Sequence, residues 1–395
     1  MGDQSISFSN SGKLSLPLWS MWVKELTVIN FKNYDEASIS FDSGVNAFTG
    51  DNGAGKTNIL DALHYLSLCK SYFNPIDSQQ IKQGAEFFMV QGVFEKNNQD
   101  DLLSCGLKRN QKKQFKKNKK DYQRLADHIG AYPLVMISPN DSVIITDGSE
   151  ERRRFIDNVI SQTDSHYLDD LISYNKCLQS RNSLLKQQGH SGKLDDDLLS
   201  IYNEQLVTIG EQIFKKRKSF MKEFVDIFNQ HYQYLTDDKE IVTLTYDSQL
   251  LHNDFLQLLK DSITKDKVLE RTTVGVHKDD LLFTIHDMPL KKFGSQGQQK
   301  SFLIALKLAQ YTFLSLEKGF KPLLLLDDIF DKLDDKRTTK LMQMVSREDF
   351  GQIFITDTNL QRVENTFKSI HIDVRIFEVS NGQITSPLTY HGQDK

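Results

Sequence analysis

The stretch GDNGAGKT, residues 50–57, constrains the fold of this chain more than any other part of the sequence. It fits the pattern G-x-x-x-x-G-K-[ST], in which glycines let the backbone curl so that successive N–H groups converge on phosphate oxygens. We expect Lys56 to contact the β- and γ-phosphates of ATP and the Thr57 hydroxyl to bind Mg²⁺. The predicted nucleotide-binding residues of this loop are Gly50, Asp51, Asn52, Gly53, Ala54, Gly55, Lys56 and Thr57.

The residues on either side of the loop predict a strand before it and a helix after it. An alternating apolar run precedes the loop, and apolar residues at helical spacing follow it: Val45, Ala47 and Phe48, then Ile59, Leu60, Leu63 and Leu66. The positive end of the helix dipole then adds to the anion site. Such a strand–loop–helix unit is typical of α/β nucleotide-binding proteins.

A second chemical signal lies far along the chain, in the run Leu323–Asp328. Four consecutive leucines predict a strand that is covered on both faces, and the two carboxylates that follow it would point at the nucleotide crevice. We expect Asp327 to hold Mg²⁺ through water and Asp328 to orient the attacking water, which makes Asp328 and Lys56 the predicted catalytic residues. The alternative is a plain strand exit.

The segment Phe293–Lys300 precedes a predicted amphipathic helix from Ser295 to Leu314. Ser295 can cap this helix and leave free N–H groups for an anion, so Ser295, Gly297 and Gln298 form a second predicted nucleotide contact. Two phosphate-binding helix starts in one chain suggest a composite site, in which one copy supplies the loop and another copy supplies this second start. An ordinary helix cap is the alternative.

Lys32 and Asn33 lie in a connection between two predicted strands. A lysine beside a phosphate loop can contact phosphate or ribose, so both residues are candidate nucleotide contacts. A solvated turn explains them equally well.

Composition sets limits on the class of protein. The chain has 395 residues, 38% of them hydrophobic and 26% charged, which is enough for two or three domains. It contains no apolar run near the ~20 residues that span a bilayer and no N-terminal signal-like run, so we expect a cytoplasmic protein without membrane contact. The three cysteines are isolated, and the net charge of −4 leaves DNA contacts to local basic patches.

Three basic clusters are candidates for such patches. Eight of the thirteen residues from Lys108 to Lys120 are basic, and Arg152–Arg154 and Lys215–Lys218 lie on predicted helices. Each cluster can face a phosphate backbone, but a solvated loop or helix face is the common alternative.

The pattern along the chain predicts four segments. Residues 1–20 are Ser-rich and read either as a disordered leader or as the result of an upstream start, with Met21 as the functional start. Residues 21–140 read as the first part of an α/β head, residues 141–265 as an inserted helical arm, and residues 266–395 as the second part of the head. No proline occurs between Pro139 and Pro289, in agreement with long helices. The head is thus assembled from both ends of the chain.

The order of Gly50–Thr57, Ser295–Gln299 and Leu323–Asp328 resembles an ABC-type ATPase head of the structural-maintenance kind, and more narrowly the RecF family of DNA replication and repair proteins. The resemblance runs from Met21 to about Pro387. It also rests on these stretches: Asn30–Tyr34, Ser138–Asp141, Arg152–Asp157, Gln179–Lys186, Gly275–Asp280 and Gly294–Gln298.

The resemblance implies roles for individual residues. Ser295 matches the signature serine that contacts the γ-phosphate bound on the other protomer, and Asp331–Asp334 matches the next loop of the dimer interface. The chain departs from many ABC ATPases in having Thr356-Asp357-Thr358 where a histidine is common, and Lys278 stands where arginine is more frequent.

The resemblance further implies an ATP-dependent homodimer that binds single- and double-stranded DNA at gap junctions and hydrolyses ATP slowly to release itself. The implied partners are RecR- and RecO-type mediator proteins, and the implied outcome is loading of a recombinase. Two alternatives remain open: an ATPase subunit of a transporter, and a nuclease-associated head. The inserted arm and the Ser-Gln-Gly-Gln signature argue against the first, and the lack of a third carboxylate cluster argues against the second.

Overall fold

The computed structural model describes residues 21–191, 195–237, 240–330, 335–345, 350–385 and 387–391. The predicted leader 1–20 and the predicted interface loop Asp331–Asp334 lie outside these residues. No helix in the described ranges is long and apolar enough to cross a membrane.

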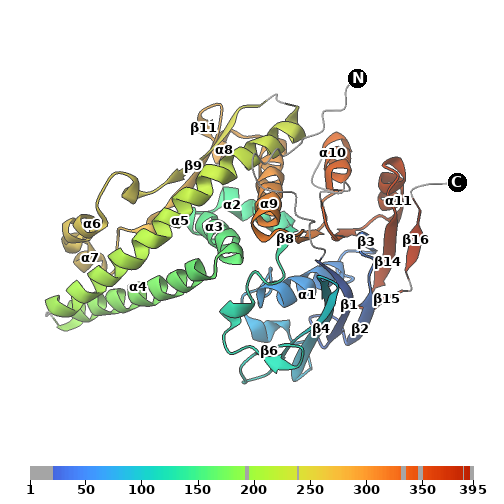
Figure 1. Ribbon diagram of the computed structural model, residues 1–395, viewed down its shortest axis with the longest axis horizontal. Helices are drawn as coiled ribbons and strands as arrows, with labels where there is room; N and C mark the ends of the chain where they lie inside the picture. Colours follow the sequence, from blue (N-terminus) through green and yellow to red (C-terminus); the bar gives the residue numbers. More distant parts are fainter. Residues whose placement is uncertain are drawn as a thin grey trace.

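A seven-stranded sheet forms the centre of the head (Figure 1). Its strands run in the order β15-β14-β3-β13-β12-β8, with β16 paired to β14. Every residue of β3, β13, β12 and β8 is buried, as expected for parallel strands covered on both faces. The bounds are β3 Val45–Thr49, β8 Leu134–Ile137, β12 Leu323–Leu326, β13 Ile353–Asp357, β14 Val374–Ser380, β15 Gln383–Ile384 and β16 Leu388–Tyr390.

A six-stranded antiparallel sheet lies beside it, in the order β2-β1-β4-β5-β6-β7. Helix α1, Lys56–Leu68, lies between the two sheets, and its apolar residues share one core with both. The bounds are β1 Met21–Ile29, β2 Glu36–Ser40, β4 Phe87–Lys96, β5 Gln99–Lys108, β6 Gln114–Lys117 and β7 Lys120–Asp121. The phosphate loop therefore leads into a helix that packs against a sheet on each side.

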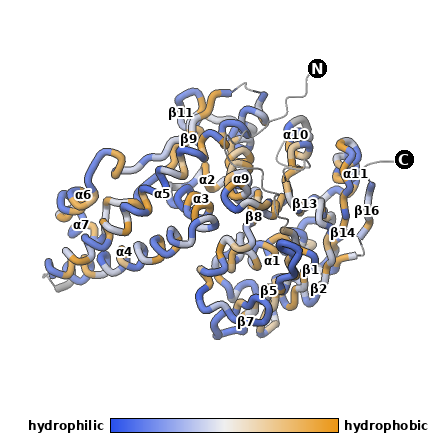
Figure 2. Tube along the Cα trace, in the orientation of Figure 1, coloured by the Kyte–Doolittle hydropathy of each residue, from blue (hydrophilic) through white to orange (hydrophobic). Residues whose placement is uncertain are grey.

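Long helices extend away from the head (Figure 1). Helices α4 and α5 lie side by side and alternate polar and apolar residues along their length (Figure 2). Helix α9 packs on α5 and on strand β8, and thus joins the helical part to the central sheet. The bounds are α2 Val143–Thr146, α3 Ser149–Thr163, α4 Ser165–Ser191, α5 Asp196–Thr236, α6 Phe255–Asp261, α7 Ile263–Leu269, α8 Leu290–Phe293, α9 Gln296–Lys318, α10 Asp335–Val345 and α11 Leu360–Ser369.

A small antiparallel sheet, in the order β11-β10-β9, completes the helical side. Its strands are β9 Val242–Asp247, β10 Asp280–Ile285 and β11 Met288–Pro289. Strand β9 comes before residue 265 in the chain and strand β10 after it, so their pairing joins the two sides of the predicted end of the arm. Short 3-10 turns join several elements: η1 Asp77–Gln80, η2 Leu125–His128, η3 Pro139–Ser142, η4 Gln249–Leu251 and η5 Val276–Lys278.

The α/β fold predicted from the sequence is confirmed, including the strands before the phosphate loop and before Asp327. Two features were not predicted. Helix α5 is continuous over 41 residues, a length that the sequence pattern did not indicate. Strands β14 to β16 follow β13 and extend the central sheet beside β3. The predicted domain boundaries stay a prediction.

Candidate nucleotide site

The phosphate loop follows β3 directly, and two of its glycines touch neighbouring segments. Gly50 has φ 144°, and a Cβ atom there would lie 2.1 Å from the carbonyl oxygen of Val379 in β14. Gly55 has φ 120°, and a Cβ atom there would lie 2.6 Å from Nδ2 of Asn33. Both positions combine a left-handed backbone with close neighbours, so only glycine fits.

Lys56 and Thr57 begin α1, and both side chains point into the site. The Lys56 side chain is buried, and its Nζ donates to the carbonyl oxygens of Gly50 at 2.8 Å and Asp51 at 3.0 Å. The Thr57 hydroxyl donates to Oδ1 of Asp327 at 2.8 Å. The fold thus brings together the phosphate loop and the acidic strand end, which are 270 residues apart in the chain.

Asp327 directly follows the buried strand β12 and is held by several groups. Its N–H donates to the carbonyl oxygen of Ile137 at 2.8 Å, and its carboxylate accepts a second hydroxyl, from Thr356, at 2.8 Å. Burial raises the pKa of Asp327, while the hydroxyls of Thr57 and Thr356 oppose that rise. Asp328 follows with φ 46°, in the left-handed region.

Lys32 and Asn33 lie behind the loop. The Lys32 ammonium forms an ion pair with the buried carboxylate of Asp61 in α1. Asn33 Nδ2 donates to the carbonyl oxygen of Ala54 at 3.0 Å, and the Tyr34 hydroxyl donates to that of Gly55 at 3.1 Å. Asn33 and Tyr34 therefore support the loop backbone, and nucleotide contact by Lys32 and Asn33 stays a prediction. The supporting role of Tyr34 was missed, because nothing in its local sequence distinguishes it from a core tyrosine.

Ser295 is the N-cap of α9, as predicted from the sequence. Its Oγ accepts from the Gln298 N–H at 3.2 Å, and Gln298 Oε1 accepts from the Ser295 N–H at 2.8 Å. A Cβ atom on Gly297 would lie 2.9 Å from Nη1 of Arg337. In the described part of the chain, Ser295 makes side-chain hydrogen bonds only within the first turn of α9, so this protomer's own phosphate loop is not its partner.

Strand β13 ends in Thr356 and Asp357, at the position where many ABC ATPases have a histidine. These two side chains point to opposite faces of the sheet. Thr356 faces Asp327, whereas Asp357 accepts two hydrogen bonds from Nη2 of Arg362, both at 2.8 Å, and one from the Asn359 N–H at 2.6 Å. Asp357 therefore fixes the start of α11. The sequence named this position but did not indicate which of its side chains faces the site.

The three basic clusters differ in how many of their charges are paired. Arg152 binds Asp280 at 2.6 Å, and Arg153 donates to the carbonyl oxygen of Asp279 at 2.6 Å. The other ion pairs of the clusters Arg152–Arg154 and Lys215–Lys218 are Arg154 with Glu150 and Glu151, Lys215 with Glu211, Lys216 with Asp164, and Arg217 with Asp157 and Asp279. Most charges of these two clusters thus serve internal contacts.

The cluster from Lys108 to Lys120 runs from the end of β5 through β6 to the start of β7. Three of its lysines pair internally, Lys113 with Asp77, Lys116 with Asp121 and Lys117 with Asp101. Four others are exposed and have no ion pair within the described ranges; we call them the hairpin lysines: Lys108, Lys112, Lys119 and Lys120.

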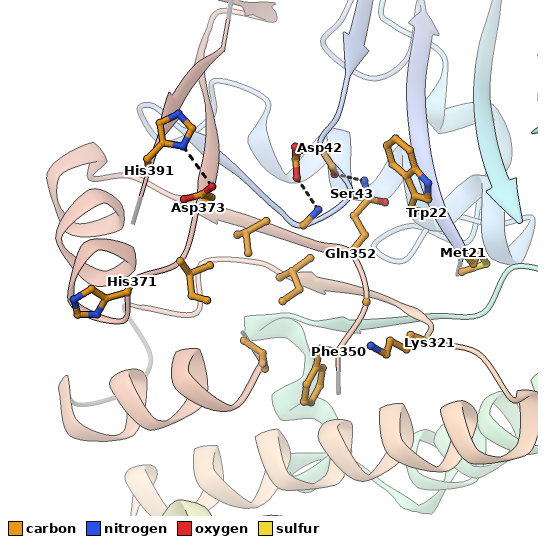
Figure 3. A pocket seen from close by; sticks show the side chains of 16 residues that line it. Met21, Trp22, Asp42, Ser43, Lys321, Phe350, Gln352, His371, Asp373 and His391 are labelled. Carbon is orange, nitrogen blue, oxygen red and sulfur yellow. Dashed lines mark hydrogen bonds and ion pairs between the residues drawn. The ribbon is translucent and has the colours of Figure 1, made fainter. Parts of the chain in front are cut away.

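A hollow of about 1040 Å³ lies at the edge of the central sheet opposite the phosphate loop (Figure 3). It is lined by residues that precede β3, β13 and β14, among them Asp42, Gln352 and Asp373. The phosphate loop and Thr356 lie where β3 and β13 end, so this hollow is separate from the nucleotide site. Its size alone gives it no role.

The fold and the site together define a head domain of the structural-maintenance class, in which a phosphate loop contacts an acidic strand end. The family model described as RecF/RecN/SMC N terminal domain matches residues 22–385. The head domain of an Smc protein from Pyrococcus furiosus, which is 16% identical, has a TM-score of 0.55 over 94% of this chain and 96% of the other, a likeness of fold alone.

Closer relatives narrow this class. A solved structure of the recombination mediator protein RecF with ATP, in the RecFOR pathway, is 31% identical with a TM-score of 0.85 and covers 94% of this chain and 98% of that one. The DNA replication and repair protein RecF of Flavobacterium johnsoniae is 52% identical over 91% of this chain and its own full length, and that of Phocaeicola vulgatus is 48% identical over 92% and 98%. The chain belongs to the RecF family.

Proposed function

We propose that this chain is an ATP-dependent DNA-binding protein of replication and recombinational repair, which dimerises with ATP and leaves DNA after slow hydrolysis. The observation that carries the proposal is the hydrogen bond from Thr57 to Asp327, which joins the phosphate loop to the acidic strand end. A loop for phosphate and a carboxylate for its metal, held in direct contact, are the two parts of a Mg·ATP site.

The donor set fits Mg²⁺. This ion prefers oxygen ligands and is commonly bound by one or two carboxylates, substrate phosphates and water. Thr57 and Asp327 would hold it, and the Thr57 proton that points at Asp327 leaves a hydroxyl lone pair for the metal. When bound, Mg²⁺ neutralises charge on the β- and γ-phosphate oxygens.

The remaining site residues act on the triphosphate in this proposal. Lys56 exchanges its two backbone carbonyl partners for β- and γ-phosphate oxygens and stabilises the charge that develops during hydrolysis. Asp328 orients the attacking water. Ser295 with Gly297 and Gln298 contacts the γ-phosphate bound on a second copy, which is consistent with a capping serine that does not reach its own loop.

The hairpin lysines are our proposed contact with the DNA backbone. Their ammonium groups are exposed and unpaired in the described structure, whereas the arginines at positions 152–154 hold internal partners. Cations that already neutralise a carboxylate release fewer counterions from DNA than free ones do. Gapped duplexes as the target, RecR- and RecO-type partners and a cytoplasmic location complete the proposal.

The composite site is tested by light scattering with Asp328→Asn, which we expect to block hydrolysis without blocking ATP binding. With saturating Mg·ATP and a gapped duplex, this variant should form dimers, and the added change Ser295→Ala should leave ATP-bound monomers. A variant with Asp328→Asn that binds ATP but stays monomeric would disprove ATP-dependent dimerisation.

The DNA surface is tested by a salt titration of binding with fluorescent gapped duplex. We expect the triple change Lys112→Glu, Lys119→Glu and Lys120→Glu to lower the salt slope by about one for each lost phosphate contact. The matched control changes three exposed lysines of α5, Lys215→Glu, Lys218→Glu and Lys222→Glu. Equal losses in both triple variants would show that the hairpin lysines have no special role.

A further inference from the structure

Thr356 connects the two adjacent acidic residues of the site. It lies in β13 and is fully buried. Its hydroxyl donates to Oδ1 of Asp327 at 2.8 Å and accepts from the backbone N–H of Asp328 at 2.9 Å. One hydroxyl thus uses both its proton and a lone pair, and each partner is a residue to which the proposed function gives a separate role.

The position of Thr356 is fixed by the central sheet. Strand β13 pairs with β3 on one side and with β12 on the other, so its last residues lie between the strand that leads into the phosphate loop and the strand that ends at Asp327. Because successive side chains of a strand alternate, Thr356 faces Asp327 while Asp357 turns to Arg362. A rigid element therefore presents the hydroxyl.

The backbone of Asp328 needs such a contact. Its φ of 46° lies in the left-handed region, which costs a non-glycine residue roughly 1 kcal/mol or more. The hydrogen bond from the Asp328 N–H to Thr356 Oγ1 holds this conformation, and the direction of the Asp328 carboxylate follows from it. Loss of the hydroxyl would free the peptide to rotate and would misdirect the carboxylate.

We propose that Thr356 is a positioning residue for ATP hydrolysis, which aligns Asp328 with the attacking water and Asp327 with the metal through a single hydroxyl group. This inference rests on the proposed function. Thr356 need not touch the nucleotide, since it acts through the two carboxylates. A misplacement of about 1 Å in such groups can lower a rate about 100-fold, even when substrate binding is kept.

The test compares variants at position 356 that differ in their hydrogen-bonding groups. Thr356→Val keeps the shape and removes the hydroxyl, Thr356→Cys supplies a weak donor, and Thr356→Ser restores the hydroxyl. We expect kcat for ATP to fall about 10- to 100-fold in the valine variant, less in the cysteine variant, and to remain within about threefold of the parent in the serine variant. ATP affinity should stay within about threefold throughout.

A matched control is available on the neighbouring strand. Thr49 ends β3 and is buried, and its hydroxyl has no hydrogen-bond partner among the residues that the structure describes, so Thr49→Val should leave kcat unchanged. Since slow hydrolysis prolongs the ATP state, ATP-dependent dimers on DNA should persist longer with Thr356→Val, as with Asp328→Asn. A purely structural threonine would shorten that lifetime.

The outcomes separate this inference from the proposed function. If the parent protein hydrolyses ATP, Asp328→Asn stops it, and Thr356→Val keeps the parent kcat, the positioning role is overturned. It is also overturned if ATP affinity and thermal midpoint fall together with kcat and the serine variant does not recover. If the parent protein itself neither binds nor hydrolyses ATP, the proposed function fails first.

Discussion

Two buried polar clusters of this molecule use charge in opposite ways. At the nucleotide site, Lys56 and Asp327 are both buried, yet the Lys56 ammonium hydrogen-bonds to backbone carbonyls and the Asp327 carboxylate to the hydroxyls of Thr57 and Thr356. Where the helices meet the head, buried Arg217 of α5 is instead bound to Asp157 and Asp279 at 2.9 and 2.7 Å.

The difference separates a binding site from a structural joint. Arg217 contacts α3 through Asp157, the start of α4 through the Tyr167 hydroxyl, and the segment before β10 through Val276 and Asp279. Its charge is neutralised inside the protein, so nothing remains for a ligand. Within the described ranges Lys56 and Asp327 form no ion pair, and charged ligands can replace their neutral partners.

The largest effect is expected at the joint. Arg217→Met should lower the free energy of unfolding by about 3–5 kcal/mol, because it removes the cation that pairs with the buried Asp279 and the partly exposed Asp157. Urea denaturation in the absence of nucleotide measures this. The exposed neighbour serves as control, and Lys218→Met should change the free energy of unfolding by less than about 0.5 kcal/mol.

If Arg217→Met unfolds no more easily than Lys218→Met, the joint does not depend on its charges and the contrast between the clusters disappears. The variant Arg181→Met offers a second measurement, since Arg181 is fully buried and binds Asp266 at 2.7 Å. We expect a loss of similar size there.

At the nucleotide site the effect should fall on binding instead. Lys56→Met should weaken ATP binding about 100-fold or more, roughly 3 kcal/mol, because charge-assisted phosphate contacts are lost. The free energy of unfolding without nucleotide should change by less than about 1 kcal/mol, since Lys56 has only neutral partners. Calorimetric ATP titration and urea denaturation measure the two quantities.

The control for that change lies at the opposite edge of the sheet. Lys321 lines the hollow of Figure 3, and Lys321→Met should leave ATP affinity unchanged. A large loss of stability without nucleotide in Lys56→Met would mean that Lys56 belongs to the structural kind of cluster.

Sequence reasoning located the parts of the site whose signal is local. The phosphate loop, the leucine strand ending in Asp327 and the capping Ser295 each carry their chemistry within about eight residues, and each forms the predicted element. Side-chain directions that depend on how neighbouring elements pack could not be predicted. Lys32 turns to Asp61 and Asp357 to Arg362, and no local pattern encodes either choice.

The C-terminal strands show the same limit at the level of the fold. Strand β14, which was not predicted, alternates buried and exposed residues only in part. Its pairing with β3 brings Val379 against Gly50, and this contact explains why the first loop position must be glycine. The sequence pattern identifies that glycine, but only the pairing supplies the reason.

Acid should weaken both regions of the molecule through buried histidines. Burial lowers the pKa of His64 in α1 and of His231 in α5 to about 4, from an ordinary value near 6.5. The unfolded chain therefore binds more protons between these values, and stability is lost as the pH falls from 6.5 towards 4. Each histidine should contribute about 1.5 kcal/mol of loss between pH 6.5 and 5, measured by urea denaturation at both values.

Single variants assign this loss. His64→Gln and His231→Gln should each flatten the pH dependence relative to their own stability at pH 7, whereas the exposed His252→Gln should not. A parent protein that is as stable at pH 5 as at pH 6.5 would contradict buried neutral histidines in both regions.

The smallest effect is expected where a salt bridge is exposed. Arg154 pairs with Glu150 and Glu151 at 2.6 Å each, but its side chain is 65% exposed. Water and salt screen such pairs, so Arg154→Met should lower the free energy of unfolding by no more than about 0.5 kcal/mol. Its neighbour Arg152 binds Asp280 with only 13% of its side chain exposed, so Arg152→Met should cost several times more. If urea denaturation shows equal losses in the free energy of unfolding for Arg154→Met and Arg152→Met, burial does not decide how strongly an ion pair stabilises this joint. The distinction between the two clusters would then have to rest on geometry alone.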